Sequence, residues 1–97
     1  MNKLFSQALL IISNSFNLSN EDIMRRNTEN CVNARYILIG SVCKYFSDNE
    51  LSNIFHTSRS LINKIRNSIS KKCNQSYLFN QKFGEISSKI ACIFEQK

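Results

Sequence analysis

The stretch SDNELSNIFHTSRSLINKIRNSISKK, from Ser47 to Lys72, decides the fold. Ser47 is followed three residues later by Glu50, a spacing typical of a capping box that fixes the start of a helix. Apolar residues then recur at helical spacing, namely Leu51, Ile54 and Phe55. The polar residues after Phe55 interrupt this spacing. We therefore expect a short helix of about two turns that ends near His56.

A second, longer helix is predicted to begin at Thr57 or Ser58, whose hydroxyls can accept from N–H groups of the first turn. Its apolar stripe consists of Leu61, Ile62, Ile65 and Ile69. The outward residues are polar or basic and include no acid: Arg59, Ser60, Asn63, Lys64, Arg66, Asn67, Ser70 and Lys71. Two helices joined by a tight turn predict a helix-turn-helix over roughly residues 48–72.

The turn carries two further features of helix-turn-helix sequences. Ser52 supplies a small residue at the place where the two helices approach each other. His56 stands where a turn residue with positive φ is needed, and His tolerates that conformation better than most residues other than Gly. We expect His56 to act as a turn residue, not as a metal ligand or a base.

Length and composition place this helix pair in one all-helical domain spanning residues 1–97. The 97 residues include no Pro and two Gly, and 42% are hydrophobic. Helical spacing predicts further helices over about residues 3–16, 20–26, 31–46 and 77–94, with a loop near 25–31. The fold class is therefore all-α, a compact bundle of about six helices, with 31–46 at its centre. Gly84 predicts a close helix contact or a kink in the last helix.

The charge distribution indicates a polyanionic partner. Thirteen Lys and Arg against seven Asp and Glu give a net charge of +6, and no acid occurs from Leu51 to Gly84. A basic face on a helix-turn-helix is the usual footprint of a protein that binds double-stranded DNA. Two plainer interpretations stay open at this point: a solvated basic surface, or a helix pair that only packs.

The residue types on the second helix suggest individual DNA contacts. Arg59 is suited to guanine, Asn63 to adenine and Ser60 to either base. Phosphate contacts are expected from Thr57, Ser58, Lys64, Arg66, Lys71 and Lys72. Arg25 and Arg26, at a helix end, leave two interpretations open, a solvated helix end or a contact to DNA, and Arg35 is expected on the wet face of its helix.

Five segments in a fixed order carry a family resemblance: LLIISNSF, LSNEDIMRR, VNARYILIGSVCKYF, LSNIF and SISKKCNQSYLFNQKFGEISSKI. From about Leu9 to Ile90 the chain resembles the C-terminal DNA-binding domain of the bacterial replication initiator DnaA. The resemblance implies a Trp-repressor-like helical fold and duplex DNA binding. The family's base-reading signature, Gly-Gly-Arg-Asp-His-Thr-Thr-Val, falls on His56–Ile62, where this chain is one residue shorter. Arg59 and Ser60 stand nearest the family's His and first Thr. The family's arginine-rich loop, which reaches a neighbouring minor groove, falls near Arg25 and Arg26, so the resemblance implies a minor-groove or backbone contact from Arg25, Arg26 and Arg35.

Several functions are not expected. The chain has no G-x-x-x-x-G-K-[ST] phosphate loop, so if it is complete it should be a free-standing DNA binder that regulates or assists transcription or replication, without an ATPase. One His and scattered acids predict no enzymatic activity and no small-molecule substrate. Cys31, Cys43, Cys73 and Cys92 lack metal-site spacing, so no metal or cofactor is expected, and reduced thiols would suit a cytoplasmic, nucleoid-associated protein.

Two expectations concern protein partners. A homodimer is expected because two half-sites multiply specificity. The alternative function is a protein-interaction module of the same fold that docks on a replication or transcription protein. That alternative would be favoured by an exposed patch formed by Leu9, Leu10, Leu78 and Phe94. The run Ala8–Ile12 is too short to cross a membrane.

Overall fold

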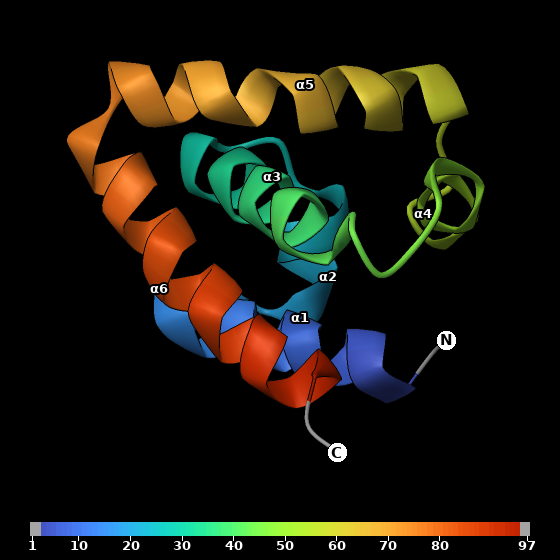
Figure 1. The fold of residues 1–97 in the computed structure, drawn as a ribbon, viewed down its shortest axis with the longest axis horizontal. Helices are drawn as coiled ribbons and strands as arrows, with labels where there is room; N and C mark the ends of the chain where they lie inside the picture. Colours follow the sequence, from blue (N-terminus) through green and yellow to red (C-terminus); the bar gives the residue numbers. More distant parts are fainter. Residues whose placement is uncertain (1–2, 96–97) are drawn as a thin grey trace.

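The computed structural model describes residues 3–95, which form six helices and no strand. The helices are α1 (Lys3–Phe16), α2 (Asn20–Arg25), α3 (Glu29–Val42), α4 (Asp48–Ile54), α5 (Arg59–Gln75) and α6 (Tyr77–Phe94). Figure 1 shows α5 along one edge of the bundle, with α4 and α6 at its two ends. The predicted all-α fold of about six helices is confirmed.

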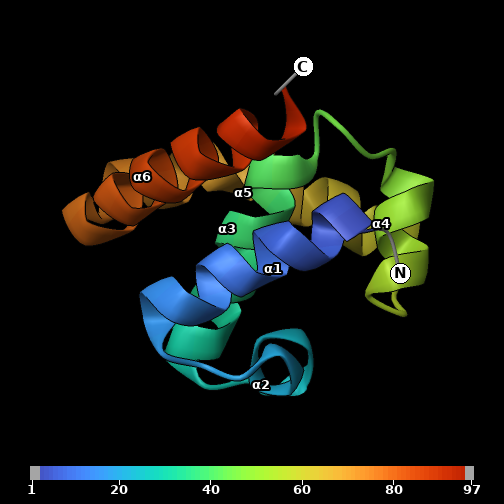
Figure 2. The same cartoon turned by 90° about the horizontal axis from the view of Figure 1, so that it is seen from below.

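Helix α3 lies at the centre and contacts α1, α2, α5 and α6, as Figure 2 shows from below. Its buried residues are Cys31, Ala34, Ile37, Leu38, Ile39, Ser41 and Val42, which occupy more than one side of the helix. A helix apolar over so much of its circumference must be covered by several neighbours. The outer helices therefore pack on α3.

Hydroxyl side chains fix where the helices begin. The predicted capping box is present: the Glu50 N–H donates to Ser47 Oγ at 3.1 Å, and the Ser47 N–H donates to Glu50 Oε1 at 3.0 Å. Thr28 caps α3, accepting from the Cys31 N–H at 3.4 Å. Helix α3 consequently begins at Glu29, two residues before the predicted start at Cys31, and the loop after α2 is shorter than predicted.

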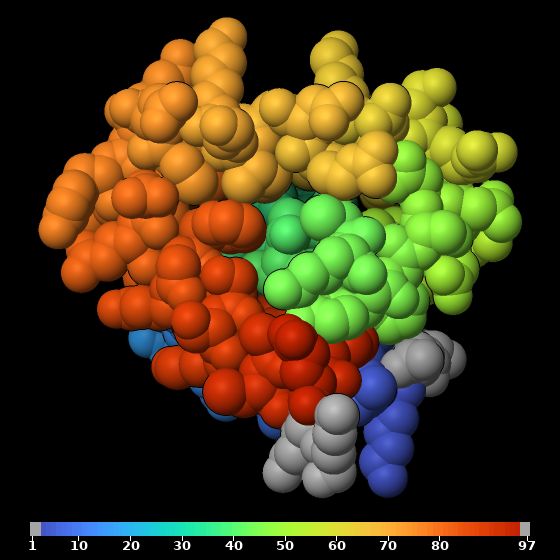
Figure 3. Space-filling model, viewed as in Figure 1, coloured from blue at the N-terminus to red at the C-terminus, as the bar shows by residue number. Residues whose placement is uncertain are grey.

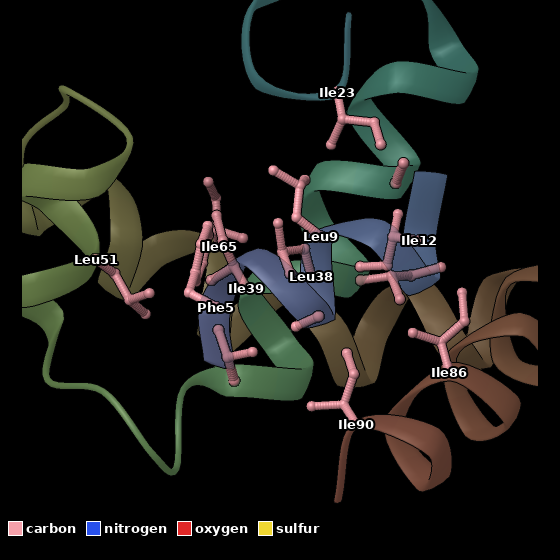
Figure 4. Close-up of a cluster of buried hydrophobic side chains, with 14 of the residues drawn as sticks. Phe5, Leu9, Ile12, Ile23, Leu38, Ile39, Leu51, Ile65, Ile86 and Ile90 are labelled. Atoms are coloured by element: carbon pink, nitrogen blue, oxygen red, sulfur yellow. The ribbon is translucent and has the colours of Figure 1, made fainter. Parts of the chain in front are cut away.

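The core joins α1 to the ends of α3 and α4. The ring of Phe5 meets Phe46 and Phe55 edge to face, with centroids 5.9 and 5.8 Å apart. Figure 4 shows Phe5, Leu51 and other apolar side chains filling the space between the helices. At the same end of α3, Tyr45 stacks on Phe94 and donates a hydrogen bond to Glu95 at 2.7 Å. No described helix is both long and apolar enough to cross a membrane.

A glycine contact is essential to this packing, but it is not at the predicted position. A Cβ built on Gly40 of α3 would lie 3.0 Å from Ile69 of α5 and 3.0 Å from Phe83 of α6. A Cβ on Gly84 would meet nothing within 4 Å, and α6 runs through Gly84 as one helix. The predicted close contact at Gly84 is wrong. The close contact is at Gly40 instead, where α3, α5 and α6 meet.

We expect the two glycines to respond oppositely to alanine. Gly84→Ala should raise the free energy of unfolding by about 1 kcal/mol, because Ala is the better helix former and has free space here. Gly40→Ala should lower it by about 1 to 3 kcal/mol, because the added methyl overpacks the contact with Ile69 and Phe83. Urea denaturation followed by circular dichroism measures both. Equal effects of the two substitutions would contradict this packing.

Candidate nucleic-acid interface

Helices α4 and α5 form the predicted helix-turn-helix arrangement. Figure 1 shows α4 nearly end-on and α5 lengthwise, so the two helices run in clearly different directions. His56 has a φ of 54°, in the left-handed region expected for the turn. The N–H groups of Thr57 and His56 donate to the carbonyls of Ser52 and Asn53 at 2.9 and 3.4 Å. This pair of bonds is a Schellman motif, which ends α4 sharply.

The start of α5 is set by its cap and by its buried stripe. Ser58 Oγ accepts from the Leu61 N–H at 3.1 Å. The stripe on the core side is formed by Ile62, Ile65 and Ile69, all buried. Leu61 was predicted to belong to this stripe, but its side chain is 42% exposed. It directly precedes Ile62, about 100° away around the helix, and lines a shallow hollow beside α3.

The outward face of α5 is open to solvent. Its members, Arg59, Ser60, Asn63, Lys64, Arg66, Asn67, Ser70 and Lys71, are all exposed. Among them Ser60, Lys64, Asn67 and Lys71 follow the spacing i, i+4, i+7 and i+11, which places them in one row along the helix. Figure 3 shows side chains of α5 standing out from the upper edge of the molecule. This row is available for contacts along the helix.

Hydrogen bonds on α5 connect Asn63 and Arg66, both predicted to contact DNA, with their neighbour Asn67. Asn63 Oδ1 accepts from Arg66 Nη2 at 2.8 Å and from Asn67 Nδ2 at 3.1 Å. Arg66 Nη1 also lies 3.0 Å from Asp48 Oδ1 of α4, an ion pair that is not aligned as a hydrogen bond. An acid from the neighbouring helix therefore balances part of the charge of Arg66.

Two of the predicted basic contacts are engaged within the protein. Lys72 lies with its Nζ 4.8 Å from the centre of the Tyr36 ring. Arg35, expected on a wet face, is partly buried. Its guanidinium donates to Ile23 O at 2.9 Å, Arg26 O at 2.6 Å and Asn27 Oδ1 at 3.3 Å. Arg35 is thus only partly exposed on the face predicted to be wet, because its guanidinium bonds α2 and the loop between α2 and α3.

The loop that Arg35 holds lies beside the helix-turn-helix. Asn27 and Thr57 line the same hollow of about 240 Å³. Arg25 and His56 line a neighbouring groove of about 780 Å³ between α1, α2 and the end of α4. Arg25 and Arg26 are both exposed, and Arg26 forms only a long ion pair with Asp22, at 3.9 Å. The structure thus brings this basic loop next to the turn.

The described residues offer little for other chemistry. No group of three or more His, Cys, Asp or Glu side chains among them is placed to hold a metal ion. The four cysteines are free thiols, with Cys31 buried and Cys92 exposed. Burial raises the pKa of the Cys43 and Cys73 thiols above the usual value, which keeps them protonated and weakly nucleophilic near neutral pH.

No protein-family model, curated protein or solved structure matches this chain. The resemblance to the DNA-binding domain of DnaA therefore rests on the quoted segments.

Substitutions of His56 should report on the turn. His56→Gly should raise the free energy of unfolding by about 1 kcal/mol, because Gly adopts a positive φ without a Cβ clash. His56→Val should lower it by about 1 to 2 kcal/mol, because a β-branched residue is strongly strained in that region. Thermal unfolding of the three proteins gives the comparison. If Val were tolerated as well as Gly, the turn would not have this conformation.

Proposed function

We propose that the chain binds double-stranded DNA through α4 and α5, without enzymatic activity. The observation that carries this proposal is the outward face of α5, where Arg59, Lys64 and Lys71 are exposed and have no acidic partner among the described residues. A helix with this polar, basic face fits the major groove, whose walls are phosphates and whose floor is base edges.

The first turns of α5 would face the bases. Arg59, Ser60 and Asn63 stand there on exposed positions. Asn63 would have to exchange its bonds with Arg66 and Asn67 for bonds to adenine, since its side-chain oxygen already accepts from both. Arg59 has no such internal bond in the described structure. We therefore assign Arg59 the larger share of base discrimination.

Phosphate contacts would come from both ends of α5. Thr57 and Ser58 precede its first turn, where free N–H groups and the helix dipole favour an anion. Lys64 and Lys71 extend along the row that also holds Ser60 and Asn67. Arg66 would contribute less than its charge suggests because Asp48 offsets it, and Lys72 would contribute mainly by holding α5 against Tyr36.

The loop after α2 would supply a second contact to the duplex. Arg25 and Arg26 are exposed beside the turn, which supports a backbone or minor-groove contact next to the site of α5. Arg35 would act on this contact indirectly, as a positioning residue, because its guanidinium bonds the loop at Arg26 O and Asn27 Oδ1.

A relationship to the DNA-binding domain of DnaA is part of the proposal. It is supported by the order of the helices and by the place of the helix-turn-helix near the middle of the chain. The chain lacks a phosphate-loop motif, which favours a regulator or accessory factor of transcription or replication. Because Thr57–Asn63 departs from the family's signature, the DNA site would differ from the initiator's own. Two half-sites bound by a homodimer would raise specificity.

The alternative of a protein-docking module loses part of its basis. Of the four residues that were to form one exposed patch, Leu9 is buried and Phe94 packs against Tyr45. Leu10 and Leu78 are exposed, but they belong to different helices. Leu78 lines a hollow between α3 and α6.

The test of the main proposal is the salt dependence of duplex binding. With about five phosphate contacts, the logarithm of the association constant should fall with the logarithm of salt concentration with a slope of about −4 to −5. Fluorescence anisotropy of a labelled duplex, titrated with the protein at salt concentrations of about 50 to 200 mM, measures this slope. No binding at the lowest salt, or a flat dependence, would refute the proposal.

Two single substitutions separate base contact from phosphate contact. Arg59→Ala should weaken binding to a selected duplex by about 1 to 3 kcal/mol and weaken random duplex much less. Lys71→Ala should weaken both alike, because phosphates are common to every sequence. The selected duplex comes from enrichment of a random pool on the wild-type protein. If Arg59→Ala weakened binding to both duplexes equally, Arg59 would contact phosphates and not bases.

A further inference from the structure

Both terminal nitrogens of the Arg66 guanidinium are held within the protein. Nη1 lies 3.0 Å from Asp48 Oδ1 of α4, and Nη2 donates to Asn63 Oδ1 at 2.8 Å. Asp48 Oδ1 is buried, although the whole side chain is 22% exposed. Withdrawal of Arg66 would leave this buried oxygen without its cationic partner, which costs free energy. The ion pair with Asp48 thus keeps Arg66 beside Asn63.

The Asn63 amide has its oxygen occupied and its nitrogen free. Oδ1 accepts from Arg66 Nη2 and, at 3.1 Å, from Asn67 Nδ2. A carbonyl oxygen has two lone pairs, so these two bonds use its capacity as an acceptor. Asn63 is exposed, and its Nδ2 donates to no other described residue. The amide therefore presents N–H donors to the solvent and no acceptor.

The charge of Arg66 stabilises this orientation of the Asn63 amide. A hydrogen bond from a charged donor is about twice as strong as one between neutral groups. If the amide turned over, its N–H groups would meet a guanidinium that has no acceptor to offer them. The orientation that keeps the amide oxygen toward Arg66 is therefore the stable one.

We propose that Asn63 recognises guanine as a hydrogen-bond donor, and that Arg66 and Asp48 are its positioning residues. This role rests on the proposed DNA binding. Guanine presents two acceptors in the major groove, N7 and O6, which suit the two N–H donors of the amide. Adenine and thymine present one acceptor each, and cytosine presents only a donor. A bidentate pair with adenine would need the amide oxygen that Arg66 and Asn67 already occupy.

These roles differ from those predicted from residue types alone, adenine for Asn63 and a phosphate for Arg66. A residue type gives the groups that a side chain carries, but not which of them are already bonded. Here an ion pair between α4 and α5 decides which group of Asn63 is left for DNA. Asp48 would affect base recognition in this way without facing a base itself.

The experiment selects duplexes from a random pool on the wild-type chain and on single variants, and measures their affinities by fluorescence anisotropy. Asn63→Ala identifies the base pair that Asn63 reads, because the preference is lost at that position. We expect guanine there in the wild-type site, bound about fivefold more tightly than adenine. Asn63→Asp should change the preference to cytosine, because a carboxylate keeps the bonds from Arg66 and Asn67 but offers acceptors only.

Asp48→Asn tests the positioning role. It removes the charge that holds Arg66 and keeps the size of the side chain, so the Asn63 amide can turn over. The preference for guanine over adenine should fall to about twofold or less, while random duplex binds more tightly because Arg66 is freed for phosphates. Glu85→Gln is the matched control: it removes one exposed acid on α6 and should leave the base preference unchanged.

Adenine at the Asn63 position, or a guanine preference that Asp48→Asn leaves intact, would overturn this assignment while duplex binding remains. Absence of binding to any duplex would instead refute the proposed DNA binding. The free chain gives a measurement that needs no DNA. The ¹⁵N relaxation of the Asn63 side-chain amide should be that of an ordered group, and that of a mobile group in Asp48→Asn. A mobile amide in the wild-type chain would overturn the positioning role.

Discussion

The contact at Gly40 is the constraint on which the arrangement of the outer helices depends. Ile69 of α5 and Phe83 of α6 both meet the backbone of α3 at this glycine, so closely that a Cβ would lie 3.0 Å from each. Two long helices can approach one central helix at the same level only if that helix has no side chain there. This close approach fixes α5 across α3 and leaves one whole side of α5 facing the solvent.

The basic residues of the chain divide into two groups with different physical roles. Arg35, Lys72 and Lys82 bond carbonyl oxygens or cover aromatic rings, and they connect segments that are distant in sequence. Arg59, Lys64 and Lys71 have no such contact among the described residues and point their charge outward. Net charge alone would count both groups as one surface, but the side chains of the second group are not held by contacts within the protein.

The two ends of α5 carry different surfaces. At its start, the turn at His56 and the loop held by Arg35 lie together and are rich in exposed arginine. At its other end, the hollow beside Leu78 is lined by acidic and basic residues, Glu29, Glu85 and Lys82. The separation follows from the length of α5, whose 17 residues keep the two surfaces apart by about 25 Å at 1.5 Å per residue.

The sequence by itself determined the local features. Helix starts at Ser47 and Ser58, the turn at His56 and the number of helices follow from spacings of a few residues, because caps and turns are built from neighbours in the chain. The start of α3 was placed two residues late because Thr28, a weak signal in a polar run, proved to be its cap. The absence of acidic residues from Leu51 to Gly84 is likewise a property of the sequence itself.

Only the tertiary structure decided which side chains are free. Arg35 bonds a carbonyl 12 residues away, and Lys82 bonds one 67 residues away. The exposure of Leu61, the pairing of Arg66 with Asp48 and the contact at Gly40 likewise depend on how the helices are placed against one another. Helical periodicity gives the face of each helix, but not the partner that covers it, because that partner comes from another part of the chain.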